Sequence, residues 1–176
     1  MTVTVRQAGV DDAALLHALA AATFALACPP GTTQASIDEF IRTQLSEEKF
    51  EGYLADPTRE LFIASVDGVA AGYTMIIHAD PTDLDVLAAV TTRPTSELSK
   101  VYVLAGHHGT GLASHLVQTT VDAARRRGSA SVWLGVNNEN AKANRFYEKQ
   151  GFAKVGTKQF LVGDKYEDDF VRALEL

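Results

Sequence analysis

The spacing of apolar residues divides the first part of the chain into one strand and two helices. Residues 2–6 alternate between apolar and polar side chains, as a half-buried strand does. After a capping aspartate, apolar side chains recur at helical spacing over residues 16–24. The run Cys28-Pro29-Pro30-Gly31 ends this helix, because proline lacks the N–H donor that a helix needs and glycine favours a turn. A second helix is predicted over residues 34–48.

Strands and helices alternate in the rest of the chain. Two apolar runs, residues 61–66 and 69–77, flank Asp67-Gly68, a pair typical of the tight turn in a β-hairpin. Residues 79–94 are predicted to form a long connection. The remaining predicted elements are a strand at 97–104, a helix at 112–127, a strand at 131–136, a helix at 140–150, and strands at 152–161 and 167–174, with a turn at Gly163-Asp164 between the last two.

This order, β-α-α-β-β-β-α-β-α-β-β, mixes hairpins with helical crossovers. Hairpins join antiparallel strands, whereas a helical crossover joins parallel ones. We therefore expect an α+β fold, a mixed α/β sandwich with a mixed sheet. Its 176 residues fit a single domain over residues 1–176, because neither a linker nor a repeat divides the chain.

The amino-acid composition limits the cellular compartment and the classes of partner that we expect for the protein. A single cysteine, Cys28, rules out an internal disulfide and suits a reducing, cytoplasmic compartment. The first residues lack the pattern of a secretory signal, and we expect no membrane-spanning run. The formal net charge of −6 argues against nucleic acid as a partner. It is compatible with a small cationic substrate and equally with a surface that keeps the protein in solution.

Three glycines, Gly106, Gly109 and Gly111, lie between a predicted strand and a predicted helix. Glycine lets the main chain approach a ligand closely, and the first turn of a helix offers unpaired N–H groups to anions. A phosphate-binding loop is one interpretation of this stretch. The other is a tight corner without a ligand.

Two familiar nucleotide-binding loops do not fit these glycines. Gly106 and Gly111 have the separation of a Walker-type loop, but Leu112 and Ala113 follow where lysine and serine or threonine are needed. A dinucleotide fingerprint needs a third glycine where this chain has Ser114.

Histidines near the glycines raise the question of a metal. His107 and His108 are adjacent and tend to point apart, and His115 is the nearest third candidate. Neither a cysteine nor a carboxylate cluster accompanies them. We therefore predict no metal site.

A second stretch, residues 132–152, carries a polar face. Asn140, Ala143 and Tyr147 are spaced to share one face of a short helix. The phenol of Tyr147 is either a functional group at the end of this face or a buried aromatic whose hydroxyl is satisfied.

Together the two stretches resemble the GNAT superfamily of acetyl-CoA-dependent N-acetyltransferases. The coenzyme loop of that family, Q/R-x-x-G-x-G/A, is similar to residues 108–113, HGTGLA. The family motif N-x-R/K-A-x-R-F-Y-E-K-x-G-F is similar to residues 140–152, NAKANRFYEKQGF. His108 replaces the usual glutamine or arginine, and because free histidine titrates near neutrality, this replacement could weaken coenzyme binding or make it sensitive to pH. The ending, GFAKVGTKQFLVGDKYEDDFVRALEL, resembles bacterial polyamine acetyltransferases of the spermidine/spermine type.

This resemblance implies acetyl-CoA as co-substrate, no metal, and a direct transfer of the acetyl group. The diphosphate would bind the loop, and the pantetheine arm would run between strands that splay apart. An N–H group, that of Val103, would hold the thioester oxygen as it becomes negative. The implied coenzyme-binding residues are Tyr102, Val103, His108, Gly109, Thr110, Gly111, Leu112, Ala113, Asn140 and Tyr147.

The implied catalytic residues are Glu97 and Tyr147. An amine acceptor arrives as an ammonium ion with a pKa of about 10, so a base must remove a proton before it attacks. Glu97 would act as that base, directly or through water, and Tyr147 would protonate the departing thiolate. Glu97 is otherwise a solvated charge at a strand end.

The resemblance leaves the acceptor and the assembly open. A primary amine of a small cationic molecule, such as a polyamine, is the favoured acceptor. Alternatives are a protein amine, or a catalytically silent sensor that only binds acetyl-CoA. The final strand could pair or exchange across a homodimer.

Overall fold

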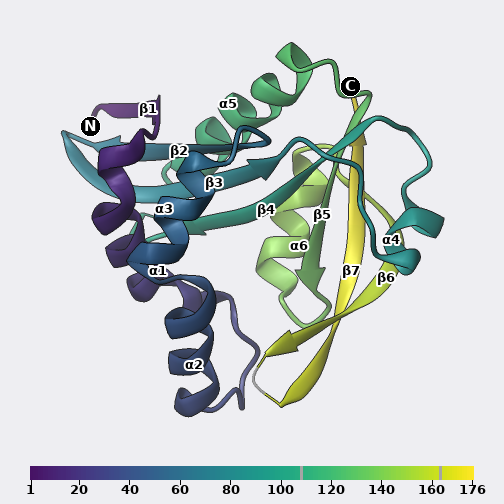
Figure 1. The fold of residues 1–176 in the computed structure, drawn as a ribbon, viewed down its shortest axis with the longest axis horizontal. Helices are drawn as coiled ribbons and strands as arrows, with labels where there is room; N and C mark the ends of the chain where they lie inside the picture. The colour runs from purple at the N-terminus through teal and green to yellow at the C-terminus, as the bar shows by residue number, and fades with distance from the viewer. Residues whose placement is uncertain (108, 163) are drawn as a thin grey trace.

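The computed structural model describes residues 1–107, 109–162 and 164–176. Its centre is a seven-stranded sheet with the strand order β1-β2-β3-β4-β5-β7-β6 (Figure 1). The strands are β1 (Val3–Gln7), β2 (Arg59–Val66), β3 (Val69–Ile77), β4 (Thr95–Val103), β5 (Ser131–Asn137), β6 (Ala153–Val162) and β7 (Lys165–Glu175). The helices are η1 (Val10–Asp12), α1 (Ala13–Ala27), α2 (Gln34–Gln44), α3 (Glu47–Ala55), α4 (Leu84–Ala89), α5 (Leu112–Arg126) and α6 (Ala141–Lys149).

The predicted α+β fold with a mixed sheet is confirmed. Neighbouring strands in the described part pair antiparallel, apart from β4 and β5, which run parallel. Both edges of β7 are occupied, by β5 and by β6. Pairing of the final strand across a homodimer would therefore require strand exchange. The predicted turn at Gly163 lies outside the described residues.

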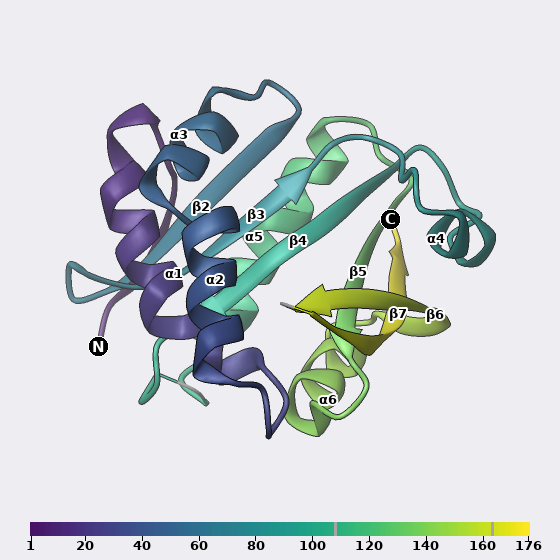
Figure 2. The ribbon, with the colours of Figure 1, turned by 60° about the horizontal axis from the view of Figure 1, so that its bottom comes forward.

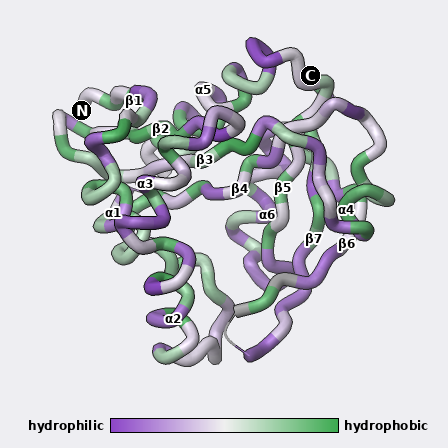
Figure 3. The backbone as a smooth tube through the Cα atoms, viewed as in Figure 1, coloured by the Kyte–Doolittle hydropathy of each residue, from purple (hydrophilic) through white to green (hydrophobic). Residues whose placement is uncertain are grey.

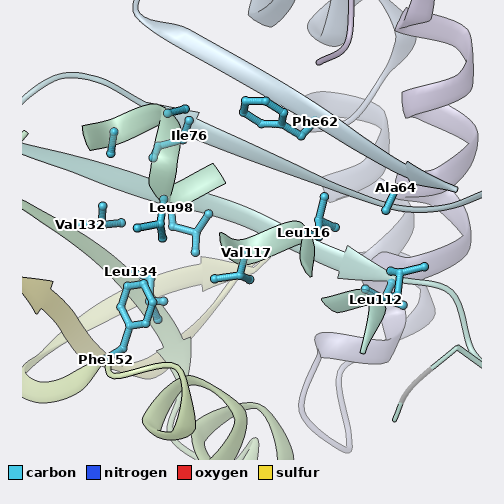
Figure 4. Packing of buried hydrophobic residues seen from close by; sticks show 14 of the residues in the cluster. Phe62, Ala64, Ile76, Leu98, Leu112, Leu116, Val117, Val132, Leu134 and Phe152 are labelled. Atoms are coloured by element: carbon cyan, nitrogen blue, oxygen red, sulfur yellow. The ribbon is translucent and has the colours of Figure 1, made fainter. Parts of the chain in front are cut away.

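Helices cover both faces of the sheet (Figures 1 and 2). On one face, apolar side chains of α1, α2 and α3 pack against β2 and β3. On the other, Leu116 and Val117 of α5 pack over the strands on the side toward Leu98, Leu112 lies toward Ala64, and Phe152 lies beside Leu134 (Figure 4). Figure 3 shows hydrophobic and hydrophilic positions alternating along α2, as expected of a helix with one buried side.

The structure corrects two helix predictions. The helix predicted over residues 34–48 is interrupted, since α2 ends at Gln44 and α3 begins at Glu47. The hydroxyl of Ser46 accepts a 3.1 Å hydrogen bond from the N–H of Lys49, so this serine caps a new helix. The connection predicted at 79–94 contains α4, which Asp83 caps through the N–H of Asp85.

One apolar segment also departs from expectation. Residues Val10–Ala27 are long and apolar enough to cross a membrane by length and composition. In the fold this segment packs on the sheet through Leu16, Leu19 and Phe24. The core helix of a soluble protein meets the same criteria.

The sheet divides where β4 meets β5. Their register covers Thr95–Ser131, Ser96–Val132 and Glu97–Trp133 and stops there. Beyond Glu97 the two strands diverge, as Figure 1 shows, and β5 continues beside β7 instead. The domain thus consists of a half-sheet β1–β4 and a half-sheet β5–β7–β6, joined along this short contact.

Buried hydroxyl groups fasten the contact. The Ser131 hydroxyl lies 2.8 Å from Thr95 Oγ1 and 2.5 Å from the carbonyl oxygen of Thr92. The hydroxyls of Ser96 and Ser129 lie 2.7 Å apart. These bonds tie the two half-sheets together at one end and leave the other end open.

Candidate functional site

Two adjoining cavities occupy the opening between β4 and β5. The first, of about 230 Å³, extends toward β6 and β7, and we call it the acceptor cavity. The second, of about 200 Å³, extends toward the glycine loop, and we call it the coenzyme cavity. They share lining residues from three elements: Ala27, Val101, Tyr102, Asn140, Ala143 and Tyr147. A molecule that reaches from the loop to the acceptor cavity therefore passes Tyr147.

The glycine loop leads into α5 without a capping side chain. Gly111 is the N-cap residue, with a φ of +81°, and Gly109 has a φ of +82°. These left-handed values favour glycine. The first helical bond runs from the N–H of His115 to the carbonyl of Gly111, at 3.0 Å. The N–H groups of the preceding turn therefore have no partner within the helix, which suits an anion.

The predicted loop residues differ from one another in where the structure places them. Gly109 and Ala113 line the coenzyme cavity. Leu112 is fully buried in the core and lines neither of the two cavities. The Thr110 hydroxyl donates to the carbonyl oxygen of His107 at 2.6 Å and so closes the turn. His108 lies outside the described residues.

Tyr147 is held by the packing of α6. Its ring meets those of Phe146 and Phe152 edge-on, with centroids 5.3 and 6.1 Å away. The helix is anchored by Asn144, whose side-chain oxygen accepts a 2.9 Å hydrogen bond from the buried Arg172 of β7. Burial raises the pKa of Tyr147, so its phenol stays protonated at neutral pH.

Asn140 has a structural task in addition to its place in the cleft. Its side-chain oxygen accepts a 3.1 Å hydrogen bond from the N–H of Ala143 and caps α6. Its side-chain NH₂ is the part left to meet a coenzyme. The predicted binding role therefore rests on that group.

Tyr102 and Val103 present different groups to the cleft. The ring of Tyr102 stacks on that of Tyr73, with centroids 5.6 Å apart, and burial raises its pKa. The N–H of Leu104 donates to Ala71 of β3 at 2.8 Å. Because main-chain groups alternate along a strand, those of Val101 and Val103 are directed to the other side, where β5 has separated.

A β-bulge brings Glu97 and Lys100 to the same cavity. Met75 of β3 pairs with Lys100, while the next residue, Ile76, pairs with Leu98, so Ser99 is an extra residue. Residues three apart on a regular strand face opposite sides, and the bulge reverses this. Burial raises the pKa of Glu97, although Lys158 and Lys100 counteract it. Burial lowers the pKa of Lys100 to about 8, against the influence of Glu97.

Sequence reasoning missed four charged residues of the acceptor cavity: Lys100, Lys158, Glu167 and Asp169. Lys158 Nζ lies 3.7 Å from Asp169 Oδ2, and the pair extends over Gly135 of β5. A Cβ atom on Gly135 would come within 2.7 Å of Lys158 Cε. The signal available in the sequence was Gly135 itself, a glycine inside a strand, which indicates close approach by another group.

The surroundings of Asp169 shift the pKa of its carboxyl group strongly. Only 6% of its surface is exposed. This burial raises its pKa to about 6, although the ammonium of Lys158 lowers it. A carboxylate with that pKa exchanges a proton close to neutral pH.

Cys28 also lines the acceptor cavity, at the end of α1. Its thiol lies 3.5 Å from the carbonyl of Phe24, and burial raises its pKa to about 11. A thiol with this pKa is a poor nucleophile at neutral pH, because the thiolate is the reactive form. The Cys28 thiol is therefore poorly suited to form an acyl-cysteine intermediate.

Metal binding finds no support in the described part of the chain. No three of its histidine, cysteine, aspartate and glutamate side chains are grouped so that they could hold an ion. The charged groups that line the acceptor cavity are carboxylates and lysines, and Lys158 and Asp169 among them form an ion pair.

The sequence model of the GNAT acetyltransferase family matches residues 23–152. The chain belongs to this family. It is similar to an uncharacterized N-acetyltransferase of Mycobacterium tuberculosis, with 42% identity over 167 residues that cover 95% of this chain and 99% of the relative. It is also similar to the streptothricin acetyltransferase of Streptomyces lavendulae, with 34% identity over 110 residues, 62% of this chain and 52% of that one.

A solved structure shows the same GNAT fold. The PaiA N-acetyltransferase from Thermoplasma acidophilum, in complex with coenzyme A, superposes with a TM-score of 0.78 over the full length of both chains at 17% identity. The family match, the N-acetyltransferase relatives and this shared fold together identify the chain as an acetyltransferase.

The perturbed carboxylate predicts a pH-dependent change in stability. The folded-state pKa of Asp169, about 6, exceeds its ordinary value of 3.8, so the native state holds this proton more tightly than the unfolded chain. Its ionisation therefore destabilises the fold as pH rises from 4 to 6. We expect the free energy of unfolding of Asp169→Asn, taken relative to that of wild type, to increase by about 2 kcal/mol from pH 4 to pH 7. Urea unfolding at the two pH values measures this change.

Gln159→Ala is the control, because Gln159 is an exposed residue of the neighbouring strand β6 that does not titrate. Its difference from wild type should be the same at both pH values. A difference for Asp169→Asn that does not change with pH would contradict the raised pKa.

Proposed function

We propose that the protein transfers the acetyl group of acetyl-CoA directly to the primary amine of a small acceptor. The observation that carries this proposal is the cleft itself. Where β4 and β5 separate, the cavity beside the glycine loop continues past Tyr147 into a cavity lined by carboxylates. A long, thin co-substrate and a small amine would meet at that point.

In this proposal the chain binds the coenzyme largely through its main chain. The N–H groups at the start of α5 receive the diphosphate, beside Gly109 and Ala113. The pantetheine arm takes the place beside β4 that β5 leaves after Glu97. The cleft-facing main chain around Val101 and Val103 polarises the thioester carbonyl as its oxygen becomes negative.

Tyr147 and Glu97 divide the proton transfers. Glu97 takes the proton that the acceptor ammonium must lose before nitrogen attacks the thioester carbon. The C–S bond then breaks, and the Tyr147 phenol, which is protonated at neutral pH, gives its proton to the thiolate. Asp169, whose pKa is raised to about 6, is the alternative base in the same cavity.

The acceptor cavity favours an amine. Glu97, Glu167 and Asp169 supply negative charge to receive an ammonium group. A polyamine, suggested by the C-terminal resemblance, is one candidate, and its reaction would take place in the reducing cytoplasm that suits the free thiol of Cys28.

Tyr147→Phe tests the acid. With a panel of primary amines and acetyl-CoA, we expect wild type to release CoA, and the variant to lose about a hundredfold in kcat because the thiolate leaves unprotonated. The dissociation constant for acetyl-CoA, measured by calorimetry, should change little. Tyr166→Phe, an exposed tyrosine on β7, is the control.

Unchanged turnover of the best acceptor by Tyr147→Phe would remove this residue from the acid role. Wild-type protein that binds acetyl-CoA but releases no CoA with any amine would instead favour a sensor.

Glu97→Gln tests the base. Without this carboxylate the acceptor must lose its proton to solvent, so the rise of kcat/KM should move to higher pH and the rate at pH 7 should fall by about a hundredfold. Asp169→Asn is compared in parallel. A pH profile that shifts in Asp169→Asn and not in Glu97→Gln would transfer the role to Asp169.

A further inference from the structure

A second opening adjoins the acceptor cavity and is richer in positive charge. This cavity, of about 700 Å³, lies between α2 and α3 and the strands β2–β4. It shares Phe40, Ser99 and Lys100 with the acceptor cavity, so the two are continuous along these residues. Its lining includes three cations, Lys49, Arg59 and Lys100, and one carboxylate, Glu39. We call it the basic groove.

The ring of Tyr53 in α3 contacts two of the cations that line the basic groove. Its hydroxyl donates a 2.8 Å hydrogen bond to the carbonyl of Gln44, which fixes the ring. The guanidinium carbon of Arg59 lies 4.9 Å from the ring centroid, and Lys100 Nζ lies 5.6 Å from it. Two cations thus gather on one aromatic ring, although like charges repel.

The two cations differ in whether a carboxylate lies close enough to neutralise their charge. Arg59 Nε lies 3.1 Å from Asp56 Oδ2, which forms an ion pair. Within the described residues, Lys100 has neither an ion pair within 4.0 Å nor a hydrogen-bond acceptor, and its ammonium lies over the Tyr53 ring. Glu97 influences Lys100 only from a greater distance. Lys100 is half-buried, and an ammonium withdrawn in part from solvent is stabilised by an anionic partner.

We propose that the basic groove binds a carboxylate of the acceptor, so that the substrate is an amphoteric primary amine such as an amino acid or a short peptide. This inference rests on the proposed function. The amine would lie in the acceptor cavity near Glu97, and the carboxylate would pair with Lys100 and reach toward Arg59. A molecule with ammonium groups at both ends would instead place a positive charge beside Lys100.

Matched acceptors that differ by one carboxylate test this inference. L-Lysine is compared with cadaverine, L-ornithine with putrescine and β-alanine with ethylamine, on wild type and on the variants Lys100→Met, Lys100→Arg and Lys154→Met. Lys154 is the control because its ammonium lies over the ring of Phe170, at 3.9 Å, outside the three cavities. Circular dichroism and thermal unfolding check that each variant is folded.

We expect wild type to favour the carboxylated member of a pair by about tenfold or more in kcat/KM, mainly through KM. Lys100→Met should abolish this preference, Lys100→Arg should retain most of it, and Lys154→Met should leave it unchanged. Equal or better use of the decarboxylated members by wild type would overturn the inference. So would a Lys100→Met variant that loses activity equally on both members, because that result indicates a purely structural lysine.

Calorimetry on the CoA complex separates this inference from the proposed function. Titration with each of the six compounds should show binding of a carboxylated member that depends on Lys100. If CoA binds and none of the three carboxylated compounds does, the carboxylate site is wrong and the acetyltransferase proposal stands. If CoA itself does not bind, the proposed function fails.

Discussion

The short parallel contact between β4 and β5 is the constraint on which the site depends. Continued pairing would fill the space between the strands with their own hydrogen bonds. Instead the contact ends at Glu97 and Trp133 and is fastened at one end by buried hydroxyls. Beyond it, β4 and β5 do not pair with each other in the described residues, so main-chain groups of both strands face the opening. The opening is therefore chemically suited to an extended molecule rich in amides.

Other elements place side chains around this opening. The bulge at Ser99 directs Glu97 and Lys100 to one side of β4, while the β6–β7 hairpin brings Lys158 and Asp169 over Gly135. The acceptor cavity and basic groove thus differ in charge over a short distance. Three carboxylates and two lysines line the acceptor cavity, whereas three cations and one carboxylate line the basic groove. Such a division favours an acceptor that carries both signs of charge.

Local patterns predicted much of the fold but little of the charge arrangement. The strands, the hairpin at Asp67-Gly68 and the glycine turn before α5 depend on short-range rules of alternation and backbone freedom. The start of α3 at Ser46 was missed, because an apolar stripe continued across a cap that could have indicated it. Asp169 and Lys158 depend on which strands become neighbours, and the insertion of β7 between β5 and β6 is a tertiary fact. The contacts of Arg59 and Lys100 with the Tyr53 ring also depend on tertiary structure, because the three residues come from β2, β4 and α3.

A crystal structure of the protein with coenzyme A tests the central claim most directly. The account predicts the diphosphate at the first turn of α5 and the pantetheine arm between β4 and β5, with its sulfur beside Tyr147. Coenzyme bound elsewhere on the molecule, or strands β4 and β5 paired along their whole length in that complex, would contradict it.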